Sequence, residues 1–266
     1  MKQPSIVICG NYGASNLGDE AILDALCGFV EKAFDQPQIT IMSANPDETM
    51  KLLRQYPSNR FRAVHFLPTG PRSLLKSFQQ KRFRSTWKAL KQTDIFVLGG
   101  GGLFTDERPR AILIWAVQAM AALLLKKPLI CLGQSVGPLK TFLGRRVVSS
   151  IMKKARFITV RDEASAQLLQ GLGISDMEIL SDVVFSLPIR HNHRPHRQPY
   201  VVLSVRPWLP TRERNVANYQ NVARFIDWLY EHKKYERSSF LSKILIHTTM
   251  ILRHFERSIM NYATQK

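Results

Sequence analysis

The sequence predicts an α/β protein built on a doubly wound, parallel, Rossmann-like sheet. Short runs of apolar, β-branched residues alternate with segments of helical period over residues 5–185. Several runs end in glycine-rich loops, at 10–18, 99–102 and 133–137. The runs are apolar without strict alternation, which is typical of parallel strands buried on both faces. Strands that alternate with helices favour a parallel sheet covered by helices on both sides.

The first strand is expected at 5–9, followed by the loop GNYGASNLG and a helix over 19–33. Asp19 and Glu20 open this helix, where carboxylates favour the positive end of the helix dipole. A strand, a glycine loop and a helix N-terminus together form an anion-binding arrangement. A plain tight turn explains the same glycines, so both interpretations stay open. The spacing matches neither the dinucleotide nor the Walker motif, so neither binding mechanism is supported.

A strongly basic segment follows the next strand–helix unit. A strand is predicted at 38–43, a helix at 46–56 capped by Asn45, and a strand at 63–67. Residues 51–93 contain eleven Lys and Arg and no Asp or Glu, within a chain whose net charge is +18. This balance indicates anionic partners such as phosphorylated molecules, lipid headgroups or nucleic acid, or else a solvated basic surface.

One basic helix is expected within 77–91, where aromatic residues lie among the cations. Such a helix can lie on an anionic membrane surface. It can equally be an outer helix with a buried aromatic stripe. No nucleic-acid-binding motif accompanies the charge, so nucleic acid is not an expected partner.

Four glycines, Gly99 to Gly102, follow the strand predicted at 95–98. One or two glycines suffice for a turn, and each further one costs conformational entropy. The run therefore predicts a backbone surface whose N–H groups approach a ligand closely. Asp106 or Glu107 either caps the next helix, expected at 111–125, or faces the cleft.

Gln134 and Ser135 lie in a second glycine turn, after the strand that begins at 128. Open α/β sheets place ligand groups at such strand ends, although a rigid Gly-Pro turn is the alternative. The remaining elements of the first domain are a helix at 142–155, a strand at 157–160, a helix at 163–172 begun by Arg161-Asp162, and the segment 177–185. Arg161 is interpreted as part of the scaffold.

Composition divides the chain into three parts: a Rossmann-like domain over 1–187, a basic hinge over 188–199, and the start of a second α/β domain over 200–266. The second domain begins with the strand YVVLSVRPW and a helix at 216–230. The three histidines of the hinge lack a carboxylate or cysteine to complete a metal site, so no metal is predicted.

The three cysteines, Cys9, Cys27 and Cys131, lie in apolar settings without metal-binding spacing. An odd number of buried cysteines predicts a reducing, cytoplasmic location. The longest apolar run, 111–125, is shorter than the roughly 20 residues that span a bilayer. The chain starts almost directly in its first strand, so no signal peptide is expected.

The motifs GNYGASNLGDEAIL, LGGGGLF and GQSVGP resemble those of the polysaccharide pyruvyltransferase family, in particular the type that modifies cell-wall polysaccharides. The resemblance runs from about Ile6 to about Trp208 and fades beyond. It implies two facing Rossmann-like domains, similar to glycosyltransferase B. It also implies transfer of a pyruvyl group from phosphoenolpyruvate to a sugar as a ketal. No cofactor is implied.

The resemblance also implies site residues. Arg206, at the end of the strand over 200–206, is implied in holding phosphoenolpyruvate, since a guanidinium suits carboxylate or phosphate. Pyruvyl transfer needs an acid and a base, and Asp19 or Glu20, together with Asp106, are the candidates for these roles or for binding the acceptor. The expected substrate-binding residues are Gly13, Asn16, Gly18, Gly100, Gly101, Gly102, Asp106, Gln134 and Ser135. The acceptor saccharide is expected on a lipid diphosphate, which suits peripheral contact of the basic segment with the inner face of the plasma membrane.

From about Lys233 onward the sequence departs from the family pattern, and an Arg-Leu-His motif expected in the second domain is not found. A truncated or frame-shifted product, or a helix-rich replacement, would explain this tail. Three alternatives to an active pyruvyltransferase therefore stay open: an inactive homologue that retains acceptor binding, a nucleotide-sugar glycosyltransferase, and a nucleic-acid-binding protein favoured by charge alone.

Overall fold

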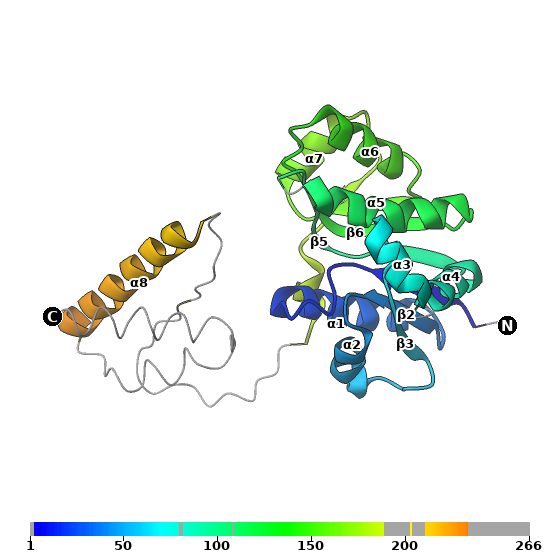
Figure 1. Ribbon diagram of the computed structural model, residues 1–266, viewed down its shortest axis with the longest axis horizontal. Helices are drawn as coiled ribbons and strands as arrows, with labels where there is room; N and C mark the ends of the chain where they lie inside the picture. The colour runs from blue at the N-terminus through cyan, green and yellow to red at the C-terminus, as the bar shows by residue number, and fades with distance from the viewer. Residues whose placement is uncertain (1–2, 80–81, 108, 189–202, 204–210, 234–266) are drawn as a thin grey trace. The chain divides into compact units, whose positions relative to one another are not determined.

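A computed structural model describes residues 3–79, 82–107, 109–188, 203 and 211–233 (Figure 1). The chain divides into two compact units, Met1–Arg190 and His191–Lys266. The first unit holds the sheet and is described first.

The first unit is organised around one sheet in which every pairing is parallel. Its strands are β1 (Ser5–Cys9), β2 (Gln38–Ser43), β3 (Phe61–His65), β4 (Ile95–Leu98), β5 (Gly101–Phe104), β6 (Leu129–Val136), β7 (Phe157–Val160) and β8 (Glu178–Ile179). The order is β3-β2-β1-β4-β6-β7-β8, and β5 pairs with β6. The chain moves outward from β1 to β3 and then returns to β4 on the other side of β1. This is the doubly wound parallel sheet that the sequence predicts.

Helices connect the strands. They are α1 (Leu17–Ala33), α2 (Pro46–Leu52), α3 (Pro71–Gln79), α4 (Arg82–Gln92), α5 (Pro109–Leu124), α6 (Phe142–Met152) and α7 (Glu163–Gln170), with 3-10 turns η1 (Leu53–Gln55) and η2 (Val183–Ser186). Asn16 caps α1, so this helix begins two residues earlier than predicted. The basic segment forms two helices, α3 and α4, where the sequence predicts one.

Both faces of the sheet are buried, as β1 illustrates. Ile6 and Ile8 pack with residues of α1, whereas Val7 and Cys9 belong to a core that includes residues of α4, α5 and α6. The two sets alternate along the strand because successive side chains point to opposite faces. The helices on opposite sides of the sheet are visible in Figure 1. Apolar residues at consecutive positions of β1 are therefore all buried, in one core or the other, which explains the uninterrupted apolar run in the sequence.

Two segments predicted as glycine turns extend the sheet instead. Gly101 and Gly102 begin β5, and Gln134 and Ser135 lie inside β6. The pairing of Gly101 with Gln134 brings the two segments together. Local sequence cannot show this, because the partners are more than thirty residues apart.

The second unit contributes α8 (Arg212–Lys233), which is longer than the helix predicted at 216–230. The predicted strand over 200–206 lies outside the described residues, apart from Leu203. The hinge and the tail after residue 233 also lie outside them, except for Pro188.

Candidate active site

The candidate site lies at the carboxyl ends of β1 and β4. These strands are neighbours in the sheet. After β1 the chain adds β2 and β3 on one side of β1, and it then adds β4 on the opposite side of β1. Open parallel sheets bind ligands at such a reversal of strand order. The loop after β1 carries Asn11, Gly13 and Asn16, and the glycine run follows β4. Two of the predicted glycine loops therefore do meet at one edge.

Asp19 is held firmly at this edge. The side-chain amides of Asn11 and Asn16 both donate to Asp19 Oδ2, at 2.7 and 2.6 Å. The Oδ1 atom of Asn16 accepts the backbone N–H of Gly18 at 3.2 Å, which caps α1. Asn16 and Gly18, both predicted to bind substrate, thus have structural contacts that orient the carboxylate of Asp19.

Glu20 is hydrogen-bonded to the loop after β1. Its Oε1 atom accepts the backbone N–H of Gly13 at 2.8 Å. Its Oε2 atom is buried and has no hydrogen-bond partner among the described residues. Burial raises the pKa of Glu20, and the charge of Asp19 raises it further, while the Gly13 N–H lowers it. Glu20 therefore keeps its proton to a higher pH than an ordinary glutamate and suits a general acid.

Gly13 must be glycine for two reasons. Its φ is +71°, and a Cβ there would lie 2.2 Å from Ser43 Oγ. The backbone N–H of Ala44 donates to Tyr12 O at 3.0 Å, so the loop is tied to the end of β2. The close approach is to the protein itself, and this gives Gly13 a structural reason beside the predicted ligand contact.

Gly99 and Gly100 are also explained by packing. A Cβ at Gly99 would lie 2.0 Å from Tyr12 Oη, and one at Gly100 would lie 2.9 Å from Gly133 O. The N–H of Gly99 donates to Cys9 O at 2.7 Å. The prediction that the whole run offers free N–H groups to a ligand is therefore wrong at Gly99.

Gly101 and Gly102 differ from the first half of the run. Gly101 has a φ of +104°, and a Cβ there would lie 3.6 Å from Asp19 Oδ1. Nothing lies within 4 Å of a Cβ at Gly102, which is exposed. Gly101, beside the carboxylate of Asp19, is buried, whereas Gly102 is open to solvent, so contact of this half of the run with a ligand stays a prediction.

Gln134 is fully buried and holds the end of β4. Its Nε2 atom donates to Leu98 O at 2.9 Å and to Gly99 O at 2.5 Å, whereas its Oε1 atom has no partner among the described residues. These contacts fix the backbone at the start of the glycine run. Gln134 thus acts as a positioning residue in the structure, and its role in substrate binding stays a prediction.

Ser135 joins a charged network at the ends of β6 and β7. Its Oγ atom donates to Asp162 Oδ2 at 2.7 Å and accepts from Arg161 Nε at 2.6 Å. Arg161 Nη1 pairs with Asp182 Oδ2 at 2.5 Å. The sequence does not reveal these partners of Arg161, because they lie in or after different strands. Its one local signal is the Arg161-Asp162 pair at a strand end.

Asp106 is engaged with the loop before α6. Its carboxylate accepts the backbone N–H groups of Lys140, at 2.8 Å, and Thr141, at 2.5 Å. These two donors hold the pKa of Asp106 below its usual value. Asp106 is thus an ionised loop anchor, and a substrate contact would have to use oxygens that already accept hydrogen bonds.

Arg206, the predicted phosphoenolpyruvate clamp, lies outside the described residues. Within the described part of the chain, no group of three or more His, Cys, Asp or Glu residues forms a metal site. Cys9, Cys27 and Cys131 are buried free thiols. None of the helices in the described ranges is both long and apolar enough to cross a bilayer.

Fold and site define an α/β protein with a candidate ligand-binding edge at its strand reversal. The sequence profile of the Polysaccharide pyruvyl transferase family matches residues 16–255, and the chain belongs to that family of transferases. The match continues well past Trp208, where the resemblance read from the motifs was expected to fade.

The individual proteins that resemble this chain share little sequence identity with it. The amylovoran biosynthesis protein AmsJ of Erwinia amylovora is 23% identical over 211 residues, which cover 70% of this chain and 49% of AmsJ. The chain thus spans about half the length of this curated relative. The Moco carrier protein of Chlamydomonas reinhardtii shows 13% identity over 68% of this chain and 91% of its own, with a TM-score of 0.33. A TM-score this low does not establish a shared fold.

Proposed function

We propose that this chain transfers the pyruvyl group of phosphoenolpyruvate to a sugar of a cell-wall or extracellular polysaccharide, where it forms a ketal. Membership of the family supports the class of reaction. The observation that carries the proposal is the adjacent pair of carboxyl groups at the β1–β4 edge. Asp19 is held by two amides, and the pKa of Glu20 is raised by burial and by Asp19.

The reaction needs an acid and a base. One sugar hydroxyl adds to C2 of phosphoenolpyruvate while C3 gains a proton and becomes a methyl group. A second hydroxyl then replaces the phosphate at C2, which leaves as inorganic phosphate. We assign the protonation of C3 to Glu20, whose pKa is raised by burial, and the acceptance of the hydroxyl proton to Asp19, whose carboxylate is oriented by two amides.

The donor carries two anionic groups. Arg206 is the proposed clamp for its carboxylate or phosphate, since a guanidinium binds either group through paired hydrogen bonds. Gly101, Gly102 and Ser135 are the proposed contacts of the acceptor sugar, because the exposed backbone of Gly102 and the Ser135 hydroxyl lie on the paired strands β5 and β6, with Gly101 next to Asp19. No cofactor or metal enters this scheme.

Phosphate release is the direct test. The chain is mixed with phosphoenolpyruvate and an amino-sugar acceptor, and release of phosphate together with a ketal product in mass spectrometry is the expected result. A parallel titration with a nucleotide-sugar addresses the rival glycosyltransferase. Turnover of the nucleotide-sugar with none of phosphoenolpyruvate would overturn the proposal. Binding of the acceptor without turnover of either donor would identify an inactive homologue instead.

We further propose that the basic segment contacts an anionic membrane at the cytoplasmic face, where a lipid-linked acceptor would be presented. Leu74 and Leu75 of α3 are exposed beside the exposed Arg72, which is the composition of an interfacial helix. Sedimentation with neutral and anionic liposomes tests this. Binding that does not depend on lipid charge would remove the membrane proposal without affecting the pyruvyl transfer.

A further inference from the structure

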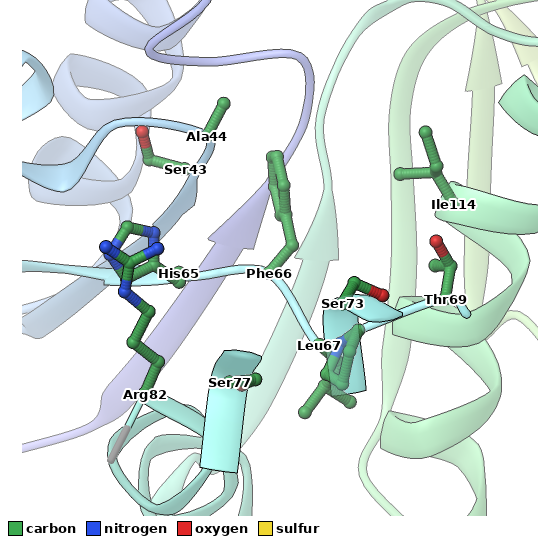
Figure 2. A pocket seen from close by; sticks show the side chains of 11 residues that line it. Ser43, Ala44, His65, Phe66, Leu67, Thr69, Ser73, Ser77, Arg82 and Ile114 are labelled. Carbon is green, nitrogen blue, oxygen red and sulfur yellow. The ribbon is translucent and has the colours of Figure 1, made fainter. Parts of the chain in front are cut away.

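A cavity of about 260 Å³ lies at the carboxyl ends of β2 and β3, beside α3, α4 and α5 (Figure 2). It is a neighbour of the candidate active site, because Ala44 in its wall is bonded to the loop after β1. None of the residues assigned to pyruvyl transfer lines it. Its walls are formed by Ser43, Ala44, His65, Phe66, Leu67, Pro68, Thr69, Ser73, Ser77, Arg82 and Ile114.

One end of the cavity is cationic. Arg82 acts electrostatically on His65, and both side chains lie at the same end in Figure 2. Among the described residues, the guanidinium of Arg82 has no carboxylate partner. Asp47 of α2 is the acid that acts on His65, and the backbone of Ala44 also interacts with the ring. No Asp or Glu occurs anywhere from Lys51 to Thr93, so the two adjoining helices supply no further negative charge.

A buried hydroxyl adds a second polar feature. Ser77 is only 7% exposed, and its Oγ atom has no hydrogen-bond partner in the described part of the chain. An unsatisfied buried hydroxyl costs free energy unless a ligand or water completes it. Ser77 lines the cavity together with Arg82, so one anion entering the cavity has donors of two kinds available.

The apolar part of the cavity wall is firmly held. Phe66 packs edge-on against Trp115, with ring centroids 5.5 Å apart. The buried amide of Gln118 accepts from Leu67 N at 2.9 Å and donates to Leu67 O at 3.1 Å. The Oγ1 atom of Thr86 donates to His65 O at 2.7 Å, which ties α4 to the end of β3. The apolar wall is therefore preformed.

We propose that this cavity binds a phosphomonoester that carries a short hydrocarbon group. The phosphoryl oxygens accept hydrogen bonds from Arg82 and Ser77, while the ring of His65, which is bonded to the backbone of Ala44, lies beside Arg82 at the same end. The hydrocarbon contacts Phe66, Leu67 and Ile114. A phosphate fits this arrangement better than a carboxylate, because its three oxygens can accept paired hydrogen bonds from the Arg82 guanidinium and a further one from the Ser77 hydroxyl. The source of such a group is a soluble metabolite or a lipid phosphate, which share this chemistry.

The proposal is tested by calorimetric titration of the full chain with hexyl phosphate, inorganic phosphate, hexanoate and hexanol. We expect hexyl phosphate to bind at least tenfold more tightly than the other three. Equal affinity for inorganic phosphate and hexyl phosphate would overturn the site, because the apolar wall would then contribute nothing. Vesicles with and without phosphatidic acid distinguish the sources: competition by phosphatidic acid identifies a lipid ligand, and its absence a soluble one.

Three variants locate the binding. Arg82→Gln is expected to lower the affinity for hexyl phosphate about tenfold or more, since a charge-assisted hydrogen bond is lost. Ser77→Ala removes a hydroxyl that has no partner, so the fold is retained while the affinity falls several-fold. Arg84→Gln is the matched control, because this arginine of α4 is exposed and does not line the cavity. Equal weakening by Arg84→Gln and Arg82→Gln would mean that only the general positive charge attracts the anion, and would refute the site.

Discussion

Two regions at the carboxyl edge of the same sheet carry opposite charge. The site at β1 and β4 holds Asp19 and Glu20, and the cavity at β2 and β3 holds His65 and Arg82. Burial raises the pKa of Glu20, with Asp19 adding to the effect, and it lowers the pKa of His65, with Arg82 adding to that effect. In both regions burial and a like charge favour the neutral form. A parallel sheet thus offers several ligand positions along one edge, and the side chains that follow each strand decide their chemistry.

The largest expected effect separates the two regions by activity. Glu20→Gln should lower the rate of pyruvyl transfer by about 10²–10⁴, the usual contribution of a general acid. The fold should survive, because an amide oxygen can still accept the Gly13 N–H. Phosphate release and circular dichroism measure the two outcomes. Glu163→Gln, at an exposed glutamate of α7, is the control. A Glu20→Gln protein with nearly full activity would exclude Glu20 as the acid.

The next effect concerns the glycine run beside the acidic region. Gly99→Ala places a Cβ 2.0 Å from Tyr12 Oη, so we expect a loss of about 1–3 kcal/mol in the free energy of unfolding. Gly102→Ala meets nothing within 4 Å and should leave stability nearly unchanged while it impairs acceptor binding. Urea denaturation compares the two. Equal stability of both variants would show that packing does not distinguish the two halves of the run.

A smaller effect tests the basic region. Arg82→Gln should raise the pKa of His65, because the arginine is one cause of its depression. The unfolded chain protonates this histidine first as the pH falls below about 6.5, so stability declines from there to the lower pKa of the folded state. The variant should lose less stability over this interval. Histidine NMR titration together with thermal unfolding checks both points. An unaltered titration of His65 would contradict the electrostatic effect of Arg82 on this histidine.

The smallest effect is a pH-dependent stability at Glu20, opposite in direction to that at His65. Its pKa in the folded chain lies above the ordinary value of 4.5, so stability is fully present below pH 4.5 and declines as the pH rises through the folded pKa. Glu20→Gln removes this decline. Its melting temperature relative to the parent chain should therefore increase from pH 4 to pH 7. A constant difference across this range would show that Glu20 titrates normally.

Much of the fold could be predicted because the relevant patterns are local. The strands at 38–43 and 157–160 have the predicted bounds, and Asn45 caps α2 as expected. The start of α1 differs because Asn16 caps the helix, and the one basic helix predicted within 77–91 corresponds to two elements, α3 and α4. The candidate site was less predictable. The sequence shows which residue types follow each strand, but it does not show which side chains or backbone groups they contact.

By itself, the sequence determined the class of fold, the family motifs and the two carboxyl groups that open α1. Apolar period, glycine loops and capping residues act over a few neighbours, so a single chain segment contains all the information needed. Only the tertiary structure decided that Gly99 packs against Tyr12, that Gln134 holds the end of β4, and that Ser77 and Arg82 line a cavity with His65. These arrangements depend on which strands become neighbours, and that is settled by burial of the whole sheet.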